Sequence, residues 1–294
     1  VLKHTARGLD AYIICDCFNY SVTYKMYGQT VPMSPDDHYQ DLKRIIAALG
    51  GKARRITVIM PMLYEGRQHR RTTRESMDCA MALQELVAMG VKNIVTFDAH
   101  DPRVNNAIPL DGFDNVQAAY QMIKALLKTV PDIKLDRDHT MIVSPDEGGM
   151  GRCIYYSSVL GLDLGMFYKR RNYSVVVNGR NPIEAHEFLG NDITGKDLIL
   201  VDDMISSGES MLDIAAKLKE KGAGRIFIFS TFGLFVEGFE KFDQYYADGK
   251  IEKIFPTNLI SQPQELLDRD WYCSVNMSKY IALLVETLNY DNSI

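Results

Sequence analysis

Short apolar runs alternate along the chain with segments in which apolar residues recur every three or four positions. The short runs are rich in β-branched residues and have the length of strands, whereas the periodic segments have the pattern of amphipathic helices. Regular alternation of the two predicts an α/β fold, a mostly parallel sheet covered by helices on both faces. The predicted strands are Asp10–Cys15, Arg55–Pro61, Asn93–Asp98, Thr140–Ser144, Gly165–Tyr168, Asp197–Val201 and Arg225–Phe229.

Start and stop signals agree with this periodicity in three predicted helices. One begins at Pro35 and ends at Gly50, a second covers Glu75–Met89, and a third runs from Gly208 to Lys221. Proline suits the first turn of a helix and glycine suits the position after the last turn.

The same plan occurs twice, because a strand and a helix precede both Asn93–His100 and Asp197–Ser210. We therefore expect two similar lobes, with a boundary in the weakly patterned stretch Asp101–Asp114. Lys169–Gly195 contains glycine, asparagine and proline with few periodic apolar residues, which predicts a long loop. Loops of that length usually have a function, such as closing over a site.

Composition narrows the function. With 294 residues, 46% of them apolar, the chain can fill a substantial core. A net charge of -5 provides no electrostatic footprint for nucleic acid or for an anionic membrane, so neither is an expected partner. Any phosphate must be held locally, which favours small phosphorylated ligands.

The sequence favours neither a membrane span nor a secretion signal. No apolar run reaches the twenty or so residues of a membrane span, and the amino terminus does not resemble a signal peptide. The five cysteines are an odd number and favour reduced thiols over a disulfide framework. We expect a cytoplasmic protein with Cys15 and Cys17 as buried strand thiols.

The segment Leu198–Ser210 carries the strongest chemical signal. An apolar run, typical of a strand buried on both faces, stops at Asp202 and Asp203, where parallel sheets bind ligands. Small hydroxyl residues and a glycine then lead into a helix, where free backbone N–H groups and the helix dipole attract phosphate. A capped helix without a ligand would explain the serines. It would not explain the two aspartates.

This segment resembles the phosphoribosyl pyrophosphate signature shared by type I phosphoribosyltransferases and ribose-phosphate pyrophosphokinases. The resemblance implies an α/β protein of two similar type I phosphoribosyltransferase-like lobes, each a mostly parallel sheet flanked by helices. It also implies that Asp202 and Asp203 bind the ribose hydroxyls. The residues implied to bind the 5-phosphate of ribose 5-phosphate are Ser206, Ser207, Gly208, Glu209 and Ser210.

Four further motifs resemble the pyrophosphokinases in particular, although each also has an ordinary reading. Arg67 and Gln68 follow a predicted strand and resemble the pair that binds ATP, although basic runs are usually solvated surface. Asp98-Ala99-His100 resembles the motif whose histidine is a magnesium ligand, although most lone histidines are structural.

The other two motifs lie in the second half of the chain. Ser144–Gly149 resembles the family's pyrophosphate loop, although a Pro-Asp-x-Gly-Gly string is also an ordinary turn. The resemblance implies Asp146, Glu147, Gly148 and Gly149 for pyrophosphate, with Asp146 also at the metal. Tyr168-Lys169-Arg170-Arg171 resembles the start of the catalytic flexible loop, although three adjacent cations are a solvated surface run in most proteins. The resemblance implies that Lys169 and Arg171 are catalytic.

Together the motifs imply an ATP-dependent diphosphotransferase with Mg²⁺ as its cofactor, ATP and ribose 5-phosphate as its substrates, and a homodimer or homohexamer as its assembly. The expected domains are an N-terminal lobe, 1–112, joined by a C-terminal helix at 275–294, and a C-terminal lobe, 113–274. A phosphoribosyltransferase and a non-catalytic regulatory paralogue are the alternatives.

The chain departs from the family pattern in several places. His69 stands where an aspartate is usual after Arg-Gln, and Asp101–Pro109 is compacted. The loop after Arg171 is longer than is typical. We expect the family's first strand and its adenine contact to lie upstream of Val1.

Overall fold

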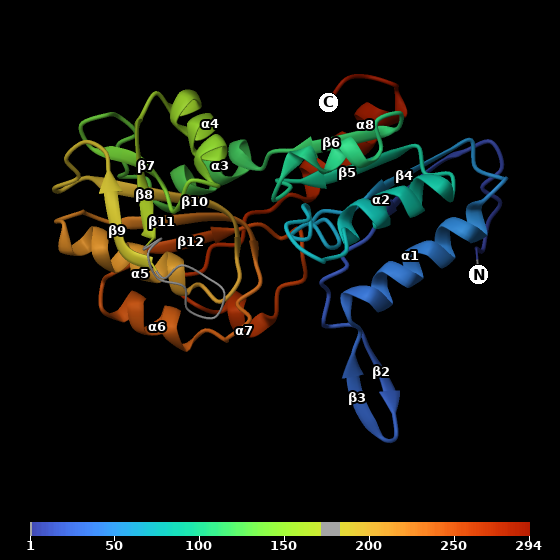
Figure 1. The fold of residues 1–294 in the computed structure, drawn as a ribbon, viewed down its shortest axis with the longest axis horizontal. Coiled ribbons are helices and arrows are strands. Elements are labelled where there is room, and N and C mark those ends of the chain that lie inside the picture. The colour runs from blue at the N-terminus through green and yellow to red at the C-terminus, as the bar shows by residue number, and fades with distance from the viewer. Residues whose placement is uncertain (1, 172–182) are drawn as a thin grey trace. The chain divides into compact units, whose positions relative to one another are not determined.

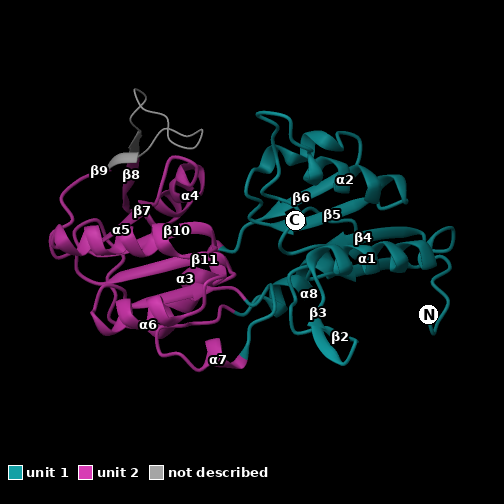
Figure 2. Ribbon diagram, turned by 60° about the horizontal axis from the view of Figure 1, so that its bottom comes forward, with its two compact units in different colours: residues 1–118, 258–263, 276–294 teal, residues 119–257, 264–275 magenta. Residues whose placement is uncertain are grey.

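The computed structural model describes residues 2–171 and 183–294; for residues 169–171 and 183–186 it describes the backbone alone. The chain divides into two compact units, coloured separately in Figure 2. Unit 1 comprises residues 1–118, 258–263 and 276–294, and unit 2 comprises residues 119–257 and 264–275. The C-terminal part of the chain therefore contributes to both units.

Unit 1 is built on a parallel sheet with the strand order β1-β4-β5-β6. Its sheet strands are β1 (Asp10–Ile14), β4 (Arg55–Ile59), β5 (Asn93–Phe97) and β6 (Gly112–Val116). Its helices are α1 (Pro35–Leu49), α2 (Asp78–Ala88), the 3₁₀ helix η1 (Pro102–Ala107) and α8 (Ser278–Asn289). A separate antiparallel hairpin, β2 (Thr23–Met26) and β3 (Gln29–Pro32), stands away from the sheet in Figure 1.

Helix α1 shows how local sequence and packing agree in this unit. The hydroxyl of Ser34 accepts the N–H of Asp37, while the Asp37 carboxylate accepts the N–H of Ser34 at 2.8 Å. This capping box satisfies two of the amide groups that a helix start leaves without partners. Leu42 and Ile46 recur at helical spacing and are buried in the core shared with α2, β1, β4 and β5.

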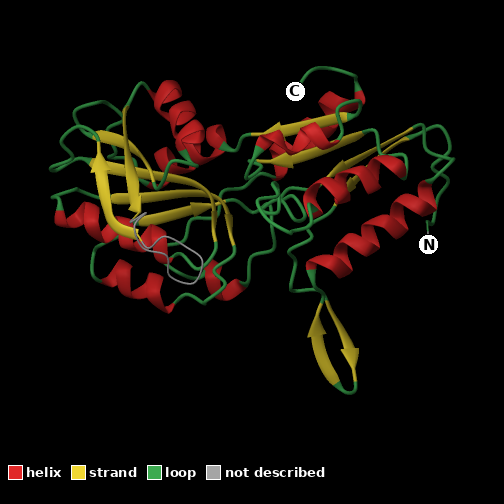
Figure 3. Ribbon diagram, viewed as in Figure 1, coloured by secondary structure: helices red, strands yellow, loops and turns green. Residues whose placement is uncertain are grey.

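Unit 2 is built on a six-stranded sheet with the order β12-β11-β10-β7-β8-β9, shown with its flanking helices in Figure 3. All neighbouring strands are parallel except β8 and β9, which are antiparallel. The strands are β7 (Thr140–Ser144), β8 (Asp163–Arg171), β9 (Ile183–Leu189), β10 (Asp197–Ile205), β11 (Ile226–Gly233) and β12 (Lys253–Pro256). The helices are α3 (Ala119–Thr129), α4 (Met150–Leu160), α5 (Glu209–Glu220), α6 (Glu240–Ala247) and α7 (Gln264–Leu267).

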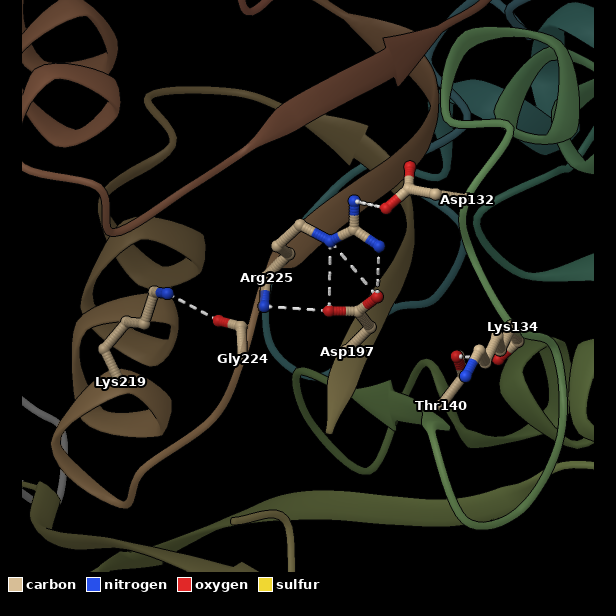
Figure 4. Close-up of polar contacts among 7 residues, drawn as sticks. All are labelled: Asp132, Lys134, Thr140, Asp197, Lys219, Gly224 and Arg225. Atoms are coloured by element: carbon tan, nitrogen blue, oxygen red, sulfur yellow. Dashed lines mark hydrogen bonds and ion pairs between the residues drawn. The ribbon is translucent and has the colours of Figure 1, made fainter. Parts of the chain in front are cut away.

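An arginine at the base of this sheet fixes the register of its central strands (Figure 4). Arg225 lies just before β11, and its Nε and Nη2 groups both donate to the carboxylate of Asp197, the first residue of β10. Its Nη1 contacts Asp132 at 2.9 Å. Two parallel bonds between guanidinium and carboxylate allow only one relative placement.

The two-lobed α/β architecture is confirmed, and each predicted strand lies on an observed one. The boundary expected after residue 112 differs from the division of the structure, because β6 pairs with β5 and keeps residues 113–118 in unit 1.

The prediction of one long loop over Lys169–Gly195 is wrong in two places. Strand β8 continues to Arg171, and Ile183–Leu189 forms β9, which pairs antiparallel with β8. The polar and apolar residues of this segment follow no regular pattern, so the sequence did not indicate a strand. The strand β9 forms through backbone hydrogen bonds to β8. Residues 172–182 of that predicted loop lie outside the described residues.

Candidate functional site

The carboxyl end of β10 carries the two aspartates of the phosphate-loop segment. The strand was expected to end at Val201, but it continues to Ile205, so Asp202 and Asp203 lie inside it. Continued pairing with β11 explains the extension, since Asp202 is level with Ser230 and Ile205 with Gly233. The aspartates are thus held by a regular strand and not by a loose turn.

The carboxyl groups of Asp202 and Asp203 interact closely. The side chain of Asp202 is 29% exposed, and its Oδ1 accepts the N–H of Asp203 at 2.9 Å. Burial raises the pKa of Asp202, and so do the charge of Asp203 and a hydrogen bond with its side chain. Two adjacent carboxylates do not readily ionise together. Asp203 is buried, with 4% of its surface exposed.

The turn after β10 depends on Gly208, which begins α5. Its φ of +82° is a left-handed conformation that glycine adopts without strain. A Cβ at this position would lie 2.1 Å from Cζ of Phe242, a buried side chain of α6. The buried Phe242 ring therefore packs directly against the backbone of this turn and leaves no space for a side chain at residue 208.

The predicted 5-phosphate residues surround the amino end of α5. Ser206 and Ser207 are half-buried, whereas Glu209 and Ser210 are exposed. The Ser207 hydroxyl accepts the N–H of Glu209 at 3.4 Å, and the Glu209 carboxylate pairs with Lys241 of α6 at 2.7 Å. The backbone of Glu209 is therefore part of this turn, while its side chain lies at the surface.

The predicted pyrophosphate loop follows β7 and leads into α4. The Ser144 hydroxyl donates to the carbonyl of Asp146 at 2.7 Å, and Oδ1 of Asp146 accepts the N–H of Gly149 at 3.1 Å. A Cβ at Gly149 would come within 3.0 Å of Oγ of Ser144. Glu147 and Gly148 are exposed at the tip of the loop. These bonds hold a tight turn with an exposed tip.

The structure brings the two loops of unit 2 together. Strands β7 and β10 are parallel neighbours, with Val143 level with Leu200, so both loops leave the same edge of the sheet. Two residues of α4 link them: Arg152 Nη1 lies 3.7 Å from Oδ1 of Asp202, and the Cys153 thiol donates to the carbonyl of Val201 at 3.5 Å. Sequence reasoning missed Arg152, although its place in the first turn after a glycine loop was a signal.

The backbone of the predicted catalytic residues Lys169 and Arg171 also lies at this edge. Strand β8 pairs with β7, and Met166 is level with Ser144. Because parallel strands run in one direction, residues 169–171 extend beyond the end of β7, where the pyrophosphate loop begins. The side chains of Lys169 and Arg171 lie outside the described part of the chain.

The predicted ATP residues belong to unit 1. Arg67 and Gln68 lie in the segment between β4 and α2, and Arg67 is exposed. The Gln68 side chain donates to the carbonyl of Ser76 at 3.0 Å and to the carboxylate of Glu75 at 3.3 Å. The glutamine therefore ties the middle of this segment to the residues just before α2.

The predicted metal ligand His100 follows β5 in the same unit. Asp98, at the end of that strand, has a φ of 43°, which residues other than glycine rarely adopt. His100 is exposed, and its ring lies edge-on to the ring of His69 with centroids 5.4 Å apart.

His69, the departure from the family pattern, has its own partners in unit 1. Its Nδ1 lies 3.1 Å from Oδ2 of Asp101, which also binds the guanidinium of Arg103. That hydrogen bond with Arg103 holds the pKa of Asp101 well below its usual range. Burial lowers the pKa of His69, and Asp101 opposes this. Asp101 and Arg103 were not among the predicted residues.

The donor set for a metal is sparse. Among residues 2–171 and 183–294, no group of three or more histidine, cysteine, aspartate or glutamate side chains could hold a metal ion. Magnesium commonly keeps several waters and is bound by one or two carboxylates together with substrate phosphates. The carboxylate of Asp146 therefore fits an ion that arrives with a nucleotide. No helix in the described chain has the length and apolar character needed to cross a membrane.

Comparison with known proteins was made for both sequence and structure. A model of the N-terminal domain of ribose phosphate pyrophosphokinase matches residues 1–90, and a model of the phosphoribosyl synthetase-associated domain matches residues 175–294. The chain is 26% identical to a ribose-phosphate pyrophosphokinase of Pasteurella multocida, over 100% of this chain and 85% of the relative. The chain is 31% identical to a ribose-phosphate pyrophosphokinase of Ureaplasma parvum, over 69% of this chain and 58% of the relative.

The fold comparison agrees with the sequence comparison. The crystal structure of phosphoribosylpyrophosphate synthetase from Mycobacterium smegmatis matches with a TM-score of 0.79 and 21% identity. The match covers 99% of this chain and 86% of that one. The fold of the chain is therefore shared with a solved structure.

Proposed function

The chain belongs to the ribose-phosphate pyrophosphokinase family, and from that premise we propose that it transfers the β,γ-diphosphoryl group of Mg-ATP to the anomeric hydroxyl of ribose 5-phosphate. The products are phosphoribosyl pyrophosphate and AMP. One observation carries this proposal: the sugar-phosphate loop and the pyrophosphate loop leave neighbouring strands at one edge of unit 2. A product that carries both groups on one ribose needs the two loops side by side.

The sugar would be held by residues of β10 and the turn after it. Backbone N–H groups from Ser206 to Ser210 would surround the 5-phosphate, because a helix start leaves several amides without partners. Asp202 and Asp203 would accept hydrogen bonds from the ribose hydroxyls. Such bonds to an ionised carboxylate are about twice as strong as neutral ones.

The nucleotide and the transferred group would use the remaining motifs. Arg67 and Gln68 would position ATP, and Lys169 and Arg171 would stabilise the charge that develops around the attacked phosphorus. His100 and Asp146 would hold magnesium, which supplies charge neutralisation to the phosphates when bound. The extension of the β8 backbone past the end of β7, where the pyrophosphate loop begins, supports the role of Lys169 and Arg171.

One assay tests the proposal. The protein is incubated with ATP, magnesium and ribose 5-phosphate, and AMP is measured with and without the sugar. We expect sugar-dependent AMP together with phosphoribosyl pyrophosphate. If the intact protein forms no AMP that depends on the sugar, the proposal is refuted and the regulatory paralogue is favoured. Consumption of phosphoribosyl pyrophosphate with a base would identify a phosphoribosyltransferase.

Assembly and location are inferred from kinship. We infer a homodimer or homohexamer in the cytoplasm, as the family resemblance implies. Light scattering of the purified protein measures the assembly directly, and a monomer at micromolar concentration would contradict it.

A further inference from the structure

Arg152 lies where the helix after the pyrophosphate loop meets the sugar-binding strand. It is in the first turn of α4, and its side chain is only 11% exposed. Its Nη1 lies 3.7 Å from Oδ1 of Asp202. The next residue, Cys153, is buried and bonds the backbone of the same strand at Val201. The start of α4 is thus anchored against β10, and the Arg152 side chain is largely buried beside Asp202.

The 3.7 Å separation has a chemical consequence. It is short enough for strong attraction between opposite charges but too long for a normal hydrogen bond. Arg152 therefore supplies positive charge to Asp202 without using one of its acceptor sites at this distance. A carboxylate kept charged in this way retains capacity to accept a hydrogen bond from a ligand.

Asp202 needs this charge because its surroundings oppose ionisation. Burial and the neighbouring carboxyl of Asp203 raise its pKa, and the guanidinium of Arg152 lowers it. On the other side of the strand, β11 places Ser230 level with Asp202, and that hydroxyl donates to the carbonyl of Phe232. Among the described side chains, the charged groups shown to act on Asp202 are Asp203 on its own strand and Arg152 on α4.

We propose that Arg152 is a positioning residue that favours the ionised form of the Asp202 carboxylate and so prepares it to bind a ribose hydroxyl. The inference rests on the proposed function, since it assumes that Asp202 binds the sugar. It makes acceptance of the sugar depend on the helix that follows the pyrophosphate loop. Discrimination between ribose 5-phosphate and 2-deoxyribose 5-phosphate then depends on a residue that does not contact the sugar.

The first experiment measures kcat/KM for ribose 5-phosphate between about pH 5.5 and 9 at saturating Mg-ATP. Arg152→Gln removes the charge at similar size, and Arg152→Lys keeps it. Arg137→Gln is the matched control, because Arg137 faces Asp163 at 3.8 Å and is 73% exposed. That control removes the same charge from the same unit, away from Asp202.

The expected direction follows from the sign of the interaction. Without the cation, Asp202 holds its proton to a higher pH, so activity on the acid side is lost. A nearby arginine typically lowers a carboxyl pKa by about one to three. The acid limb should therefore move up by at least about one pH unit in Arg152→Gln, and kcat/KM below that limb should fall about tenfold. Arg152→Lys should restore most of the activity, and Arg137→Gln should match the wild type.

Two companion readouts separate this role from a structural one. KM for Mg-ATP should stay within about twofold of the wild-type value, and the preference for ribose over 2-deoxyribose 5-phosphate should shrink in Arg152→Gln. In an Asp202→Asn background, Arg152→Gln should add little. A pH profile that coincides with the wild type, or effects that simply add in the double variant, would overturn the inference.

An NMR titration of the Asp202 carboxyl group tests its interaction with Arg152 without an activity assay. The Asp202 signal is followed by ¹³C NMR in aspartate-labelled protein and assigned by its absence from Asp202→Asn. We expect its midpoint to rise in Arg152→Gln; an unchanged midpoint contradicts the proposal even in an active enzyme. Absence of sugar-dependent AMP in the wild type would instead refute the proposed function. Arg152→Met replaces Arg152→Gln if the latter does not fold.

Discussion

Replacing Gly208 by alanine should destabilise unit 2 through two separate costs. The residue has a φ of +82°, and for an L-residue the left-handed conformation costs roughly 1–2 kcal/mol. The new Cβ would also lie 2.1 Å from Cζ of Phe242 and 2.9 Å from its Cε2. Contacts that short cannot persist, so the ring or the turn must move.

The magnitude follows from how Phe242 is packed. Its side chain is fully buried, and its ring lies 4.9 Å from that of Phe235 and 5.4 Å from that of Trp271. Moving a ring in a filled core costs about 1–3 kcal/mol. With the backbone cost, Gly208→Ala should lose about 2–5 kcal/mol, which corresponds to a fall in Tm of roughly 10 °C. Thermal and urea unfolding measure both quantities.

Gly249→Ala separates the two costs. Gly249 is in the same unit and has a φ of +66°, but an added Cβ there meets nothing within 4 Å. It should therefore show the backbone cost alone, about 1–2 kcal/mol. If Gly208→Ala proves no less stable than Gly249→Ala, the collision with Phe242 is not a real constraint and the packing argument is wrong.

Three further predictions concern chemistry and pH. Lys169→Ala should lower turnover by about a hundred- to a thousandfold with little change in substrate affinity, because a preorganised charge acts on the transition state; near wild-type turnover would remove Lys169 from the mechanism. Asp202→Ala should raise KM for ribose 5-phosphate more than KM for ATP, and unchanged saturation by the sugar would count against its role. Asp10 accepts hydrogen bonds from Arg54 and Arg55, which lower its pKa below 3.8. Asp10→Asn should lower the free energy of unfolding by about 1–2 kcal/mol at pH 7. The loss is modest because Arg54 is 64% exposed and solvent weakens its interaction with Asp10. A carboxyl group with a depressed pKa adds stability above its unfolded pKa and loses this stability as the pH falls through its folded pKa. The difference between Asp10→Asn and the wild type should therefore shrink as the pH falls, and a difference that does not change with pH would contradict this.

The fold was predicted well wherever apolar pattern and local signals agreed. The helix beginning at Pro35 is confirmed as α1, and the helix predicted over Gly208–Lys221 is confirmed as α5. The hairpin of β2 and β3 was missed because most of its residues are exposed on both faces, so no alternation marks it. Strand β6, with the sequence Gly-Phe-Asp-Asn-Val, has no apolar run to reveal it.

The candidate site was predicted as a set of loops but not as a set of contacts. Motif spacing located the turns after β7 and β10, and the parallel order of the sheet places them at one edge. The roles of their residues stay predictions. Sequence alone could not find Asp101 as the partner of His69, because the two lie on separate segments that only the folded chain brings to 3.1 Å.

The sequence by itself determined the α/β alternation, the central strands of both sheets, the glycine turns and the family, because neighbouring residues carry all of these signals. Only the tertiary structure decided how far β10 extends, that Phe242 excludes a side chain at residue 208, and that Arg152 faces Asp202. These facts depend on strand register and on packing between residues that are far apart in the chain. Pairings of that kind leave no periodic signal, because packing and charge act through space and not along the sequence.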